Sequence, residues 1–213
     1  MSSKIAPKQQ TLKFRTWGGA RRGAGRKPTG ERARAPHAAR EEVRPYQPVH
    51  VSMRVADDVW NLRSKRSFRV FDGAFRGARK RRGFRVVHFS VQGNHLHLIV
   101  EASGTRAFAL GVRGLSVRLA RGLNRMMGRR GPVFEDRYHA HVLRTPAEVR
   151  NAVGYVLGNF ESHAERRGEP RSTRSWVDPF SSAAKKSPPR EQLALFEEEV
   201  TAPAETWLLR RAS

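Results

Sequence analysis

The chain has 213 residues, a length that fits one domain of ordinary size with extensions at its ends. Its 42 Lys and Arg residues against 19 Asp and Glu residues give a formal net charge of +23, which favours nucleic acid over a membrane surface as the partner. The lack of cysteine excludes disulfide frameworks and thiolate zinc sites, and no apolar run is long enough for a signal peptide or a membrane-spanning helix. We therefore expect a cytoplasmic protein with no membrane association.

Residues 1–46 are rich in basic residues, glycine, alanine and proline and show little apolar periodicity. Such a segment cannot form a packed core, so we predict a disordered arm that binds DNA. Its segment Arg21-Arg22-Gly23-Ala24-Gly25-Arg26-Lys27-Pro28 is similar to short basic sequences that enter a DNA minor groove. A generic basic tail is the alternative interpretation. The candidate DNA contacts of the arm are Arg21, Arg22, Arg26 and Lys27.

An ordered pattern covers residues 47–166, which we assign to one domain. Residues 50–55 alternate at period two, as a β-strand does. Asp57 and Asp58 lie where acidic residues favour a helix start, and the scattered apolar residues that follow favour one helix or a pair of helices. The domain is thus predicted to open with a strand followed by helical structure.

Two β-rich segments follow at residues 84–91 and 95–101, and the Gln92-Gly93-Asn94 turn between them predicts a hairpin. Residues 107–129 have leucines near helical spacing and stop before Gly131-Pro132, which predicts a second helix. Residues 134–143 are then predicted to form a fourth strand.

The last helix of the domain is predicted to begin at Thr145-Pro146-Ala147-Glu148 and to run to about His163. In this sequence Thr is the N-cap, Pro occupies the first helical position and Glu completes a capping box. The predicted order is β-α-β-β-α-β followed by one helix. The fold class is therefore α+β, a ferredoxin-like antiparallel sheet with central first and third strands and an appended C-terminal helix.

Residues 167–213 are rich in proline, serine and charged residues, so we predict a poorly ordered tail. The tail also contains apolar residues, among them Leu193 and the Trp207-Leu208-Leu209 segment. Docking of these residues on the domain or on a partner is the alternative interpretation.

The His95-Leu96-His97 segment of the predicted third strand is the first candidate for a metal site. Residues i and i+2 of a strand face the same side, so both imidazoles can reach one metal ion. His139-Ala140-His141 is a second pair, in the predicted fourth strand. We favour the first pair because Leu96 packs more firmly than Ala140 and because the fourth strand is predicted at an edge. Such pairs also occur as ordinary surface or core histidines.

The last predicted helix places Tyr155 and Asn159 four residues apart, on one face. Taken alone, they indicate a packed tyrosine with its hydroxyl at the surface and an exposed asparagine near a helix end. Taken together with the two histidines of the third strand, Tyr155 and Asn159 favour a functional site instead.

The order of several motifs resembles that of the HUH single-tyrosine transposases of the insertion-sequence type, in particular the REP-associated branch. The motifs are Asn94-His95-Leu96-His97-Leu98-Ile99-Val100, Arg137-Tyr138-His139, Arg144-Thr145-Pro146 and Tyr155-x-x-x-Asn159. The resemblance covers residues 47–165 and implies a ferredoxin-like HUH nuclease, usually dimeric, that acts on single-stranded DNA near small hairpins.

The resemblance also implies roles for individual residues. His95 and His97 match the family's metal ligands, Tyr155 its nucleophile, and Asn159 the third ligand one helical turn later. Mg²⁺ or Mn²⁺ is the expected metal, and Mn²⁺ is better matched to nitrogen ligands. Phe160 departs from the pattern, since REP-associated relatives commonly have proline after the asparagine.

The implied reaction is a transesterification in which the Tyr155 oxygen attacks a DNA phosphorus, forms a covalent phosphotyrosine and releases a 3′-hydroxyl. The metal would act as the Lewis acid. Tyr138 is the other candidate nucleophile, although its place among strand histidines favours a structural or DNA-contacting role. Arginines of the second predicted helix are candidate phosphate contacts for the single strand: Arg113, Arg118, Arg121 and Arg125.

Two other functions remain open from the sequence. A non-catalytic nucleic-acid-binding protein on the same scaffold would keep the charge and would need no metal, because a fold does not imply an activity. A replication-initiator or relaxase nuclease of the HUH type would use the same chemical step, but such proteins are typically larger and place the tyrosine differently in the chain.

Overall fold

A computed structural model describes residues 41–45, 47–166, 168, 177–185 and 201–212. The chain divides into two units, Met1–Arg34 and Ala35–Ser213, and every described residue belongs to the second. The predicted DNA contacts Arg21, Arg22, Arg26 and Lys27 lie outside the described residues, so the role of the basic arm stays a prediction.

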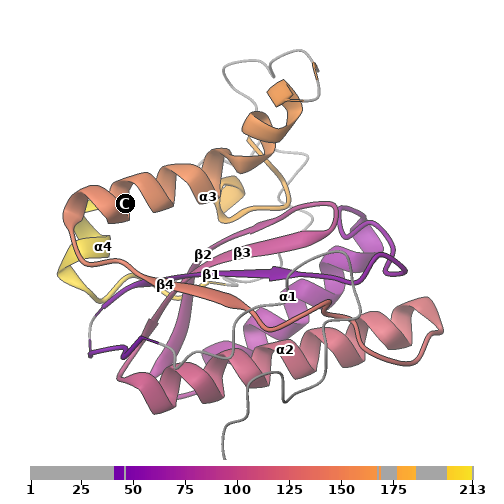
Figure 1. The fold of residues 1–213 in the computed structure, drawn as a ribbon, viewed down its shortest axis with the longest axis horizontal. Coiled ribbons are helices and arrows are strands. Elements are labelled where there is room, and N and C mark those ends of the chain that lie inside the picture. Colours follow the sequence, from indigo (N-terminus) through magenta and orange to yellow (C-terminus); the bar gives the residue numbers. More distant parts are fainter. Residues whose placement is uncertain (1–40, 46, 167, 169–176, 186–200, 213) are drawn as a thin grey trace, which may run out of the picture. The chain divides into compact units, whose positions relative to one another are not determined.

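The described unit is built around a four-stranded antiparallel sheet in the order β2-β3-β1-β4 (Figure 1). The strands are β1 (Val49–Arg54), β2 (Phe84–Val91), β3 (His95–Ala102) and β4 (His139–Val142). The first and third strands are central and the fourth lies at an edge, as the sequence predicts. The α+β arrangement is confirmed, with the third predicted strand in the middle of the sheet.

Helices cover both faces of this sheet (Figure 1). On one face lie α1 (Lys65–Arg79) and α2 (Thr105–Met127), which bury large residues such as Phe68, Phe75 and Leu119 against the sheet. On the other face lie α3 (Pro146–Arg166) and the short α4 (Trp207–Ala212). The sheet therefore separates a large aromatic core from a smaller aliphatic one.

The smaller core fixes how α3 lies on the sheet. Val149, Val153 and Val156 recur at helical spacing and are buried with Ile99 of β3. The predicted start of α3 is correct, because the Thr145 hydroxyl accepts a hydrogen bond from the Glu148 amide at 3.2 Å. The Glu148 carboxylate accepts from the Arg144 amide at 2.9 Å, one residue earlier than a capping box requires.

Two predicted boundaries of the α1–α2 layer are wrong. Helix α1 begins at Lys65, well after Asp57 and Asp58, because Ser64 is the N-cap and accepts a hydrogen bond from the Ser67 amide. Helix α2 ends at Met127, before the predicted stop at Gly131-Pro132. Gly128 adopts a left-handed conformation there, with a φ of 64°, which ends the helix.

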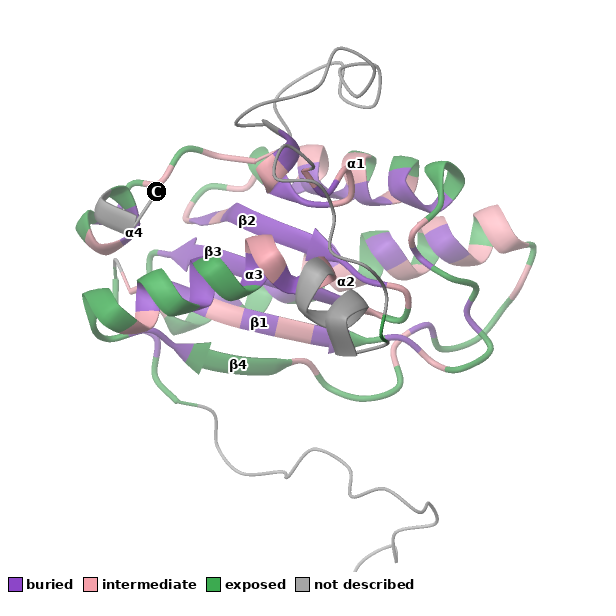
Figure 2. Cartoon of the chain, turned by 90° about the horizontal axis from the view of Figure 1, so that it is seen from above, coloured by how far each residue is buried: buried purple, intermediate pink, exposed green. Residues whose placement is uncertain are grey.

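The fourth strand is shorter than predicted. Ladder pairing with β1 is confined to His139–Val142, and Phe134 makes only an isolated bridge to Val55. Tyr138 therefore precedes the strand rather than lying in it. Figure 2 shows that β4 is exposed over most of its length while the three other strands are largely buried.

Two segments of the predicted poorly ordered tail pack on the sheet instead. Residues 201–212 lead into α4, whose Leu209 is fully buried and whose preceding Glu205 and Thr206 amides donate hydrogen bonds to the buried Glu101 carboxylate. Residues 177–185 run beside β2, where Ser181 bridges Ser90. The alternative of docking thus holds for the Trp207-Leu208-Leu209 segment, whereas Leu193 lies outside the described residues.

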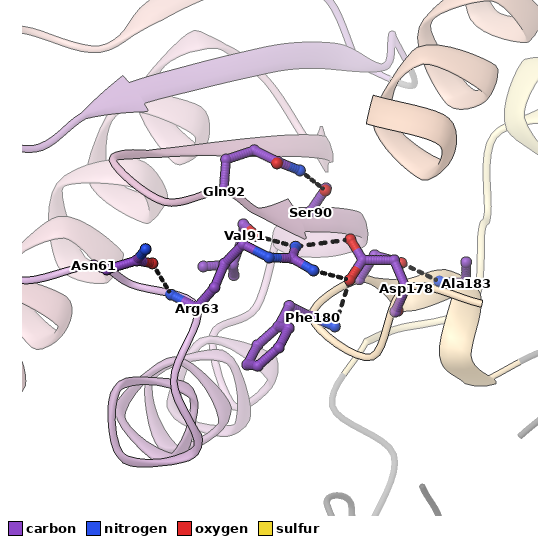
Figure 3. A network of polar contacts seen from close by, with 9 residues as sticks. Asn61, Arg63, Ser90, Val91, Gln92, Asp178, Phe180 and Ala183 are labelled. Carbon is purple, nitrogen blue, oxygen red and sulfur yellow. Dashed lines mark hydrogen bonds and ion pairs between the residues drawn. The ribbon is translucent and has the colours of Figure 1, made fainter. Parts of the chain in front are cut away.

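The segment at residues 177–185 is fastened by a buried ion pair (Figure 3). The Arg63 guanidinium donates to both Asp178 carboxylate oxygens at 2.8 and 3.0 Å and to the Val91 carbonyl oxygen at 2.9 Å. Its carbon atom Cζ also lies 3.9 Å from the centre of the Phe160 ring and 4.7 Å from that of Phe180. Arg63 therefore connects the tail segment, β2 and α3.

Replacement of Asp178 by alanine should destabilise the protein. The Arg63 and Asp178 side chains are only 13% and 2% exposed, so the variant leaves a mostly buried charge without its carboxylate. We expect the free energy of unfolding to fall by about 3–5 kcal/mol in urea titrations. The control is Glu135→Ala, which removes an exposed ion pair with Arg54 and should cost less than about 1 kcal/mol. Equal losses in the two variants would contradict this role of Asp178.

Candidate active site

The face of the sheet under α3 is rich in histidine. The register pairs His97 with Ser52 and Ser90, and pairs His50 with Ile99 and His141. Because directly paired residues of neighbouring strands point to the same side, these rows mark one face. The six histidines of the described strands share it: His50, His88, His95, His97, His139 and His141.

The predicted nucleophile lies against the centre of this face. The Tyr155 ring centre is 5.2 Å from that of His97, edge to face, and 5.9 Å from that of His50. His97 is buried, whereas Tyr155 is 43% exposed. A phenol in this position is held next to the histidines and is still accessible to a large substrate from solvent.

The two predicted ligand histidines lie side by side, as the i and i+2 spacing requires. Their ring centres are 4.9 Å apart, with the planes nearly perpendicular. The Nδ1 atom of His95 is 2.8 Å from Oδ1 of Asn94, and the Nδ1 atom of His97 is 3.2 Å from Nε2 of His50. Each ring therefore has a neighbour that contacts its Nδ1 atom.

Asn159 lies one turn after Tyr155 on α3 and is 1% exposed. Taken alone, the sequence indicates an exposed asparagine near a helix end at this position. In the structure the Asn159 side chain is buried. Neither its carboxamide oxygen nor its nitrogen has a hydrogen-bond partner in the part of the chain that the structure describes. A buried amide in that state costs about 1–3 kcal/mol, so it fits a group that completes its bonding with a ligand.

These residues fit a divalent metal. Two imidazoles and one carboxamide oxygen match the nitrogen and oxygen donors that Mn²⁺ accepts and leave positions for a phosphate oxygen and water. Among the described residues, no set of three His, Asp or Glu side chains is arranged to hold a metal ion. The third donor of the predicted set is a carboxamide, that of Asn159, and its role as a ligand stays a prediction.

His50 is the residue that the sequence analysis misses. It lies in β1 directly beside β3, and its ring stacks on His97 with centres 5.3 Å apart. Burial, and secondly the nearby His141, lower the pKa of His50, which favours its neutral form. Its period-two position in the first predicted strand was the available signal, but only the strand order shows that it meets His97.

Comparison with one solved structure gives the same fold. The structure of a REP-associated tyrosine transposase bound to a REP hairpin aligns with a TM-score of 0.56 and 16% identity, over 79% of this chain and 94% of that one. This chain shares the fold of that transposase structure. A proposed transposase from Deinococcus radiodurans R1 aligns with a TM-score of 0.39 and 11% identity, over 65% of this chain and 100% of that one. No protein-family model and no curated protein sequence matches the chain.

The alternative site residues that the sequence offers lie elsewhere. Tyr138 packs edge to face against Phe108, with ring centres 5.8 Å apart, in the core between the sheet and the α1–α2 layer. His139 and His141 share the face of His97 but are exposed on β4, where His141 Nε2 is 3.8 Å from a Glu148 carboxylate oxygen. The structure therefore brings only Tyr155 of the two candidate tyrosines to the paired histidines.

The predicted phosphate contacts of α2 are not in this site. Their side chains are exposed on the helix layer that covers the opposite face of the sheet: Arg113, Arg118, Arg121 and Arg125. The arginines and Tyr155 thus face different sides of the sheet.

None of the helices in the described residues combines the length and the apolar character needed to cross a membrane.

Replacement of Asn159 by leucine should leave the protein as stable or more stable. The variant removes a buried amide that lacks partners and keeps the branching of the side chain, so we expect a change in the free energy of unfolding of about 0 to +2 kcal/mol. The control is Gln92→Leu, which removes a buried amide that donates to the Ser90 hydroxyl at 2.7 Å and should destabilise by about 1–3 kcal/mol. Urea titration distinguishes them, and a large loss in Asn159→Leu would indicate a structural role.

Proposed function

We propose that this protein is a transposase that cleaves and rejoins single-stranded DNA through a covalent phosphotyrosine at Tyr155. The observation that carries the proposal is the contact of an exposed tyrosine with the paired histidines, at a ring distance of 5.2 Å from His97. The shared fold with a transposase bound to a DNA hairpin supports the same reaction class. The net charge of +23 supports a polyanionic substrate.

In the proposed step, the Tyr155 oxygen attacks a backbone phosphorus, and the bond from that phosphorus to the 3′ oxygen breaks. The phenol loses its proton, and the leaving 3′ oxygen gains one to become a hydroxyl. One phosphodiester is exchanged for another, so a 3′-hydroxyl from another strand end can reverse the step without ATP. This exchange explains why a tyrosine nucleophile suits rejoining better than an activated water does.

We further propose that His95, His97 and Asn159 hold a divalent metal, Mg²⁺ or Mn²⁺. When bound, such an ion supplies Lewis-acid polarisation of a non-bridging phosphate oxygen. The chain's contribution is geometric, because β3 fixes the two imidazoles and α3 carries both the carboxamide and the nucleophile. With a metal held there, a bound phosphate would lie beside the partly exposed Tyr155.

The proposed substrate is single-stranded DNA near a hairpin, bound by a homodimer. The α2 arginines lie over the opposite face of the sheet from Tyr155, so they would contact phosphates that are not being cleaved. We assign them to binding rather than to catalysis: Arg113, Arg118, Arg121 and Arg125. The basic arm, with Arg21 to Lys27, would add further contacts.

Replacement of Tyr155 by phenylalanine should abolish the covalent adduct and leave DNA binding nearly unchanged, because only the attacking hydroxyl is removed. The measurement is a denaturing gel after incubation of the protein with labelled hairpin-bearing single-stranded DNA and Mn²⁺. Tyr138→Phe is the matched control and should keep the adduct, since Tyr138 packs in the other core. Survival of the shifted band in Tyr155→Phe would overturn the assignment. Absence of the band in the wild type across several hairpin substrates would favour a protein that only binds DNA.

Replacement of the four α2 arginines by glutamine should weaken binding of single-stranded DNA and reduce its salt dependence. Each lost phosphate contact lowers the slope of log affinity against log salt by about 0.7, so a full set lowers it by up to about 3. Fluorescence anisotropy at several salt concentrations measures the slope. A variant with four lysines at the same positions keeps the charge and should retain most of the salt-dependent slope. An unchanged slope in the glutamine variant would exclude these residues from the interface: Arg113, Arg118, Arg121 and Arg125.

A further inference from the structure

The tautomer of a ligating histidine decides whether it can bind a metal. A neutral imidazole carries its proton on one nitrogen, and only the other nitrogen has a lone pair to donate. A hydrogen bond at the first nitrogen selects between the two forms. The contacts of the Nδ1 atoms of His95 and His97 therefore determine what their Nε2 atoms can do.

At His95 the contact fixes the tautomer directly. Its Nδ1 atom is 2.8 Å from Oδ1 of Asn94. A carboxamide oxygen can only accept, so His95 must carry its proton on Nδ1 in this contact. The lone pair of His95 is then on Nε2.

At His97 the partner is another imidazole. His97 Nδ1 and His50 Nε2 are 3.2 Å apart, so one of the two donates and the other accepts. If His50 donates, His97 carries its proton on Nε2 and cannot bind a metal through that atom. If His97 donates from Nδ1, its lone pair is on Nε2, as in His95.

We propose that His50 and Asn94 are positioning residues that hold His97 and His95 in the Nδ1-protonated form and present both Nε2 atoms to a divalent cation. The inference rests on the proposed function and extends it to two residues that contact the ligands rather than the metal. His50 accepts from His97 and carries its own proton on Nδ1. Its ring also stacks on His97, with ring centres 5.3 Å apart, and meets the Tyr155 ring at a steep angle, with ring centres 5.9 Å apart.

The first test measures the tautomer in the metal-free, full-length protein. Long-range ¹H–¹⁵N correlation spectra distinguish a protonated from an unprotonated imidazole nitrogen. We expect His97 to be protonated at Nδ1 in the wild type and in His50→Gln, because the glutamine carboxamide oxygen can accept in place of Nε2. In His50→Leu we expect a mixture of the two forms. A His97 pattern that is identical in wild type and His50→Leu would overturn the proposal.

The second test measures Mn²⁺ binding without DNA, from the loss of the free-ion signal in electron paramagnetic resonance. Loss of an outer partner of a ligating histidine typically weakens metal binding about 10–100-fold, which is the expectation for His50→Leu and for Asn94→Ala. His50→Gln should bind within about 5-fold of the wild type, because its carboxamide restores the acceptor. The control is His139→Gln, which alters an exposed β4 histidine that is paired with Ser52 rather than with His50 and should leave affinity unchanged.

The outcomes separate this inference from the proposed function. Equal losses of affinity in His50→Gln and His50→Leu would overturn a positioning role, because a restored acceptor would then restore no binding. A wild type that binds no Mn²⁺ while His97→Ala behaves identically would overturn the metal site of the proposed function. The tautomer spectra of the metal-free protein would still decide the contact between His50 and His97.

Discussion

The packing of α3 on the inner rows of the sheet is the constraint on which the candidate site depends. Val149, Val153 and Val156 bury their side chains against Ile99 of β3, and this apolar contact fixes both the height and the rotation of the helix. Tyr155 is one residue before the buried Val156, so the same rotation brings its ring to the edge of the aliphatic core and onto His97. A helix docked differently would carry the phenol away from the imidazoles.

A second consequence of this packing is the burial of Asn159. Apolar residues recur along α3 at the positions that face the sheet, and Asn159 occupies the next such position. An aliphatic residue there would extend the core, and the carboxamide instead enters it without partners in the described structure. Proteins tolerate such a cost mainly where a polar group has a function, which is the physical argument for a ligand at this point.

Two C-terminal segments, residues 177–185 and 201–212, pack on the domain that the sequence analysis ends at residue 166. The Arg63 guanidinium joins Asp178 to the Val91 carbonyl (Figure 3). Its Cζ atom also lies 3.9 Å from the centre of the Phe160 ring and 4.7 Å from that of Phe180, so Arg63 links the tail segment to α3 just beyond Asn159. The family resemblance would place a proline at Phe160, and in the structure α3 continues through this residue to Arg166. A proline has no side chain that could stack on a guanidinium in this way, so the departure from the pattern has a structural explanation.

The sequence alone determined the order of elements, the start of α3 and the pairing of His95 with His97, because these depend on local periodicity and on hydrogen bonds between near neighbours. It did not determine the extent of β4, the start of α1 or the docking of residues 177–185 and 201–212, each of which depends on partners far along the chain. His50 belongs to this second group. It is 47 residues from His97 in sequence, and only the antiparallel register of β1 and β3 brings the two rings into contact.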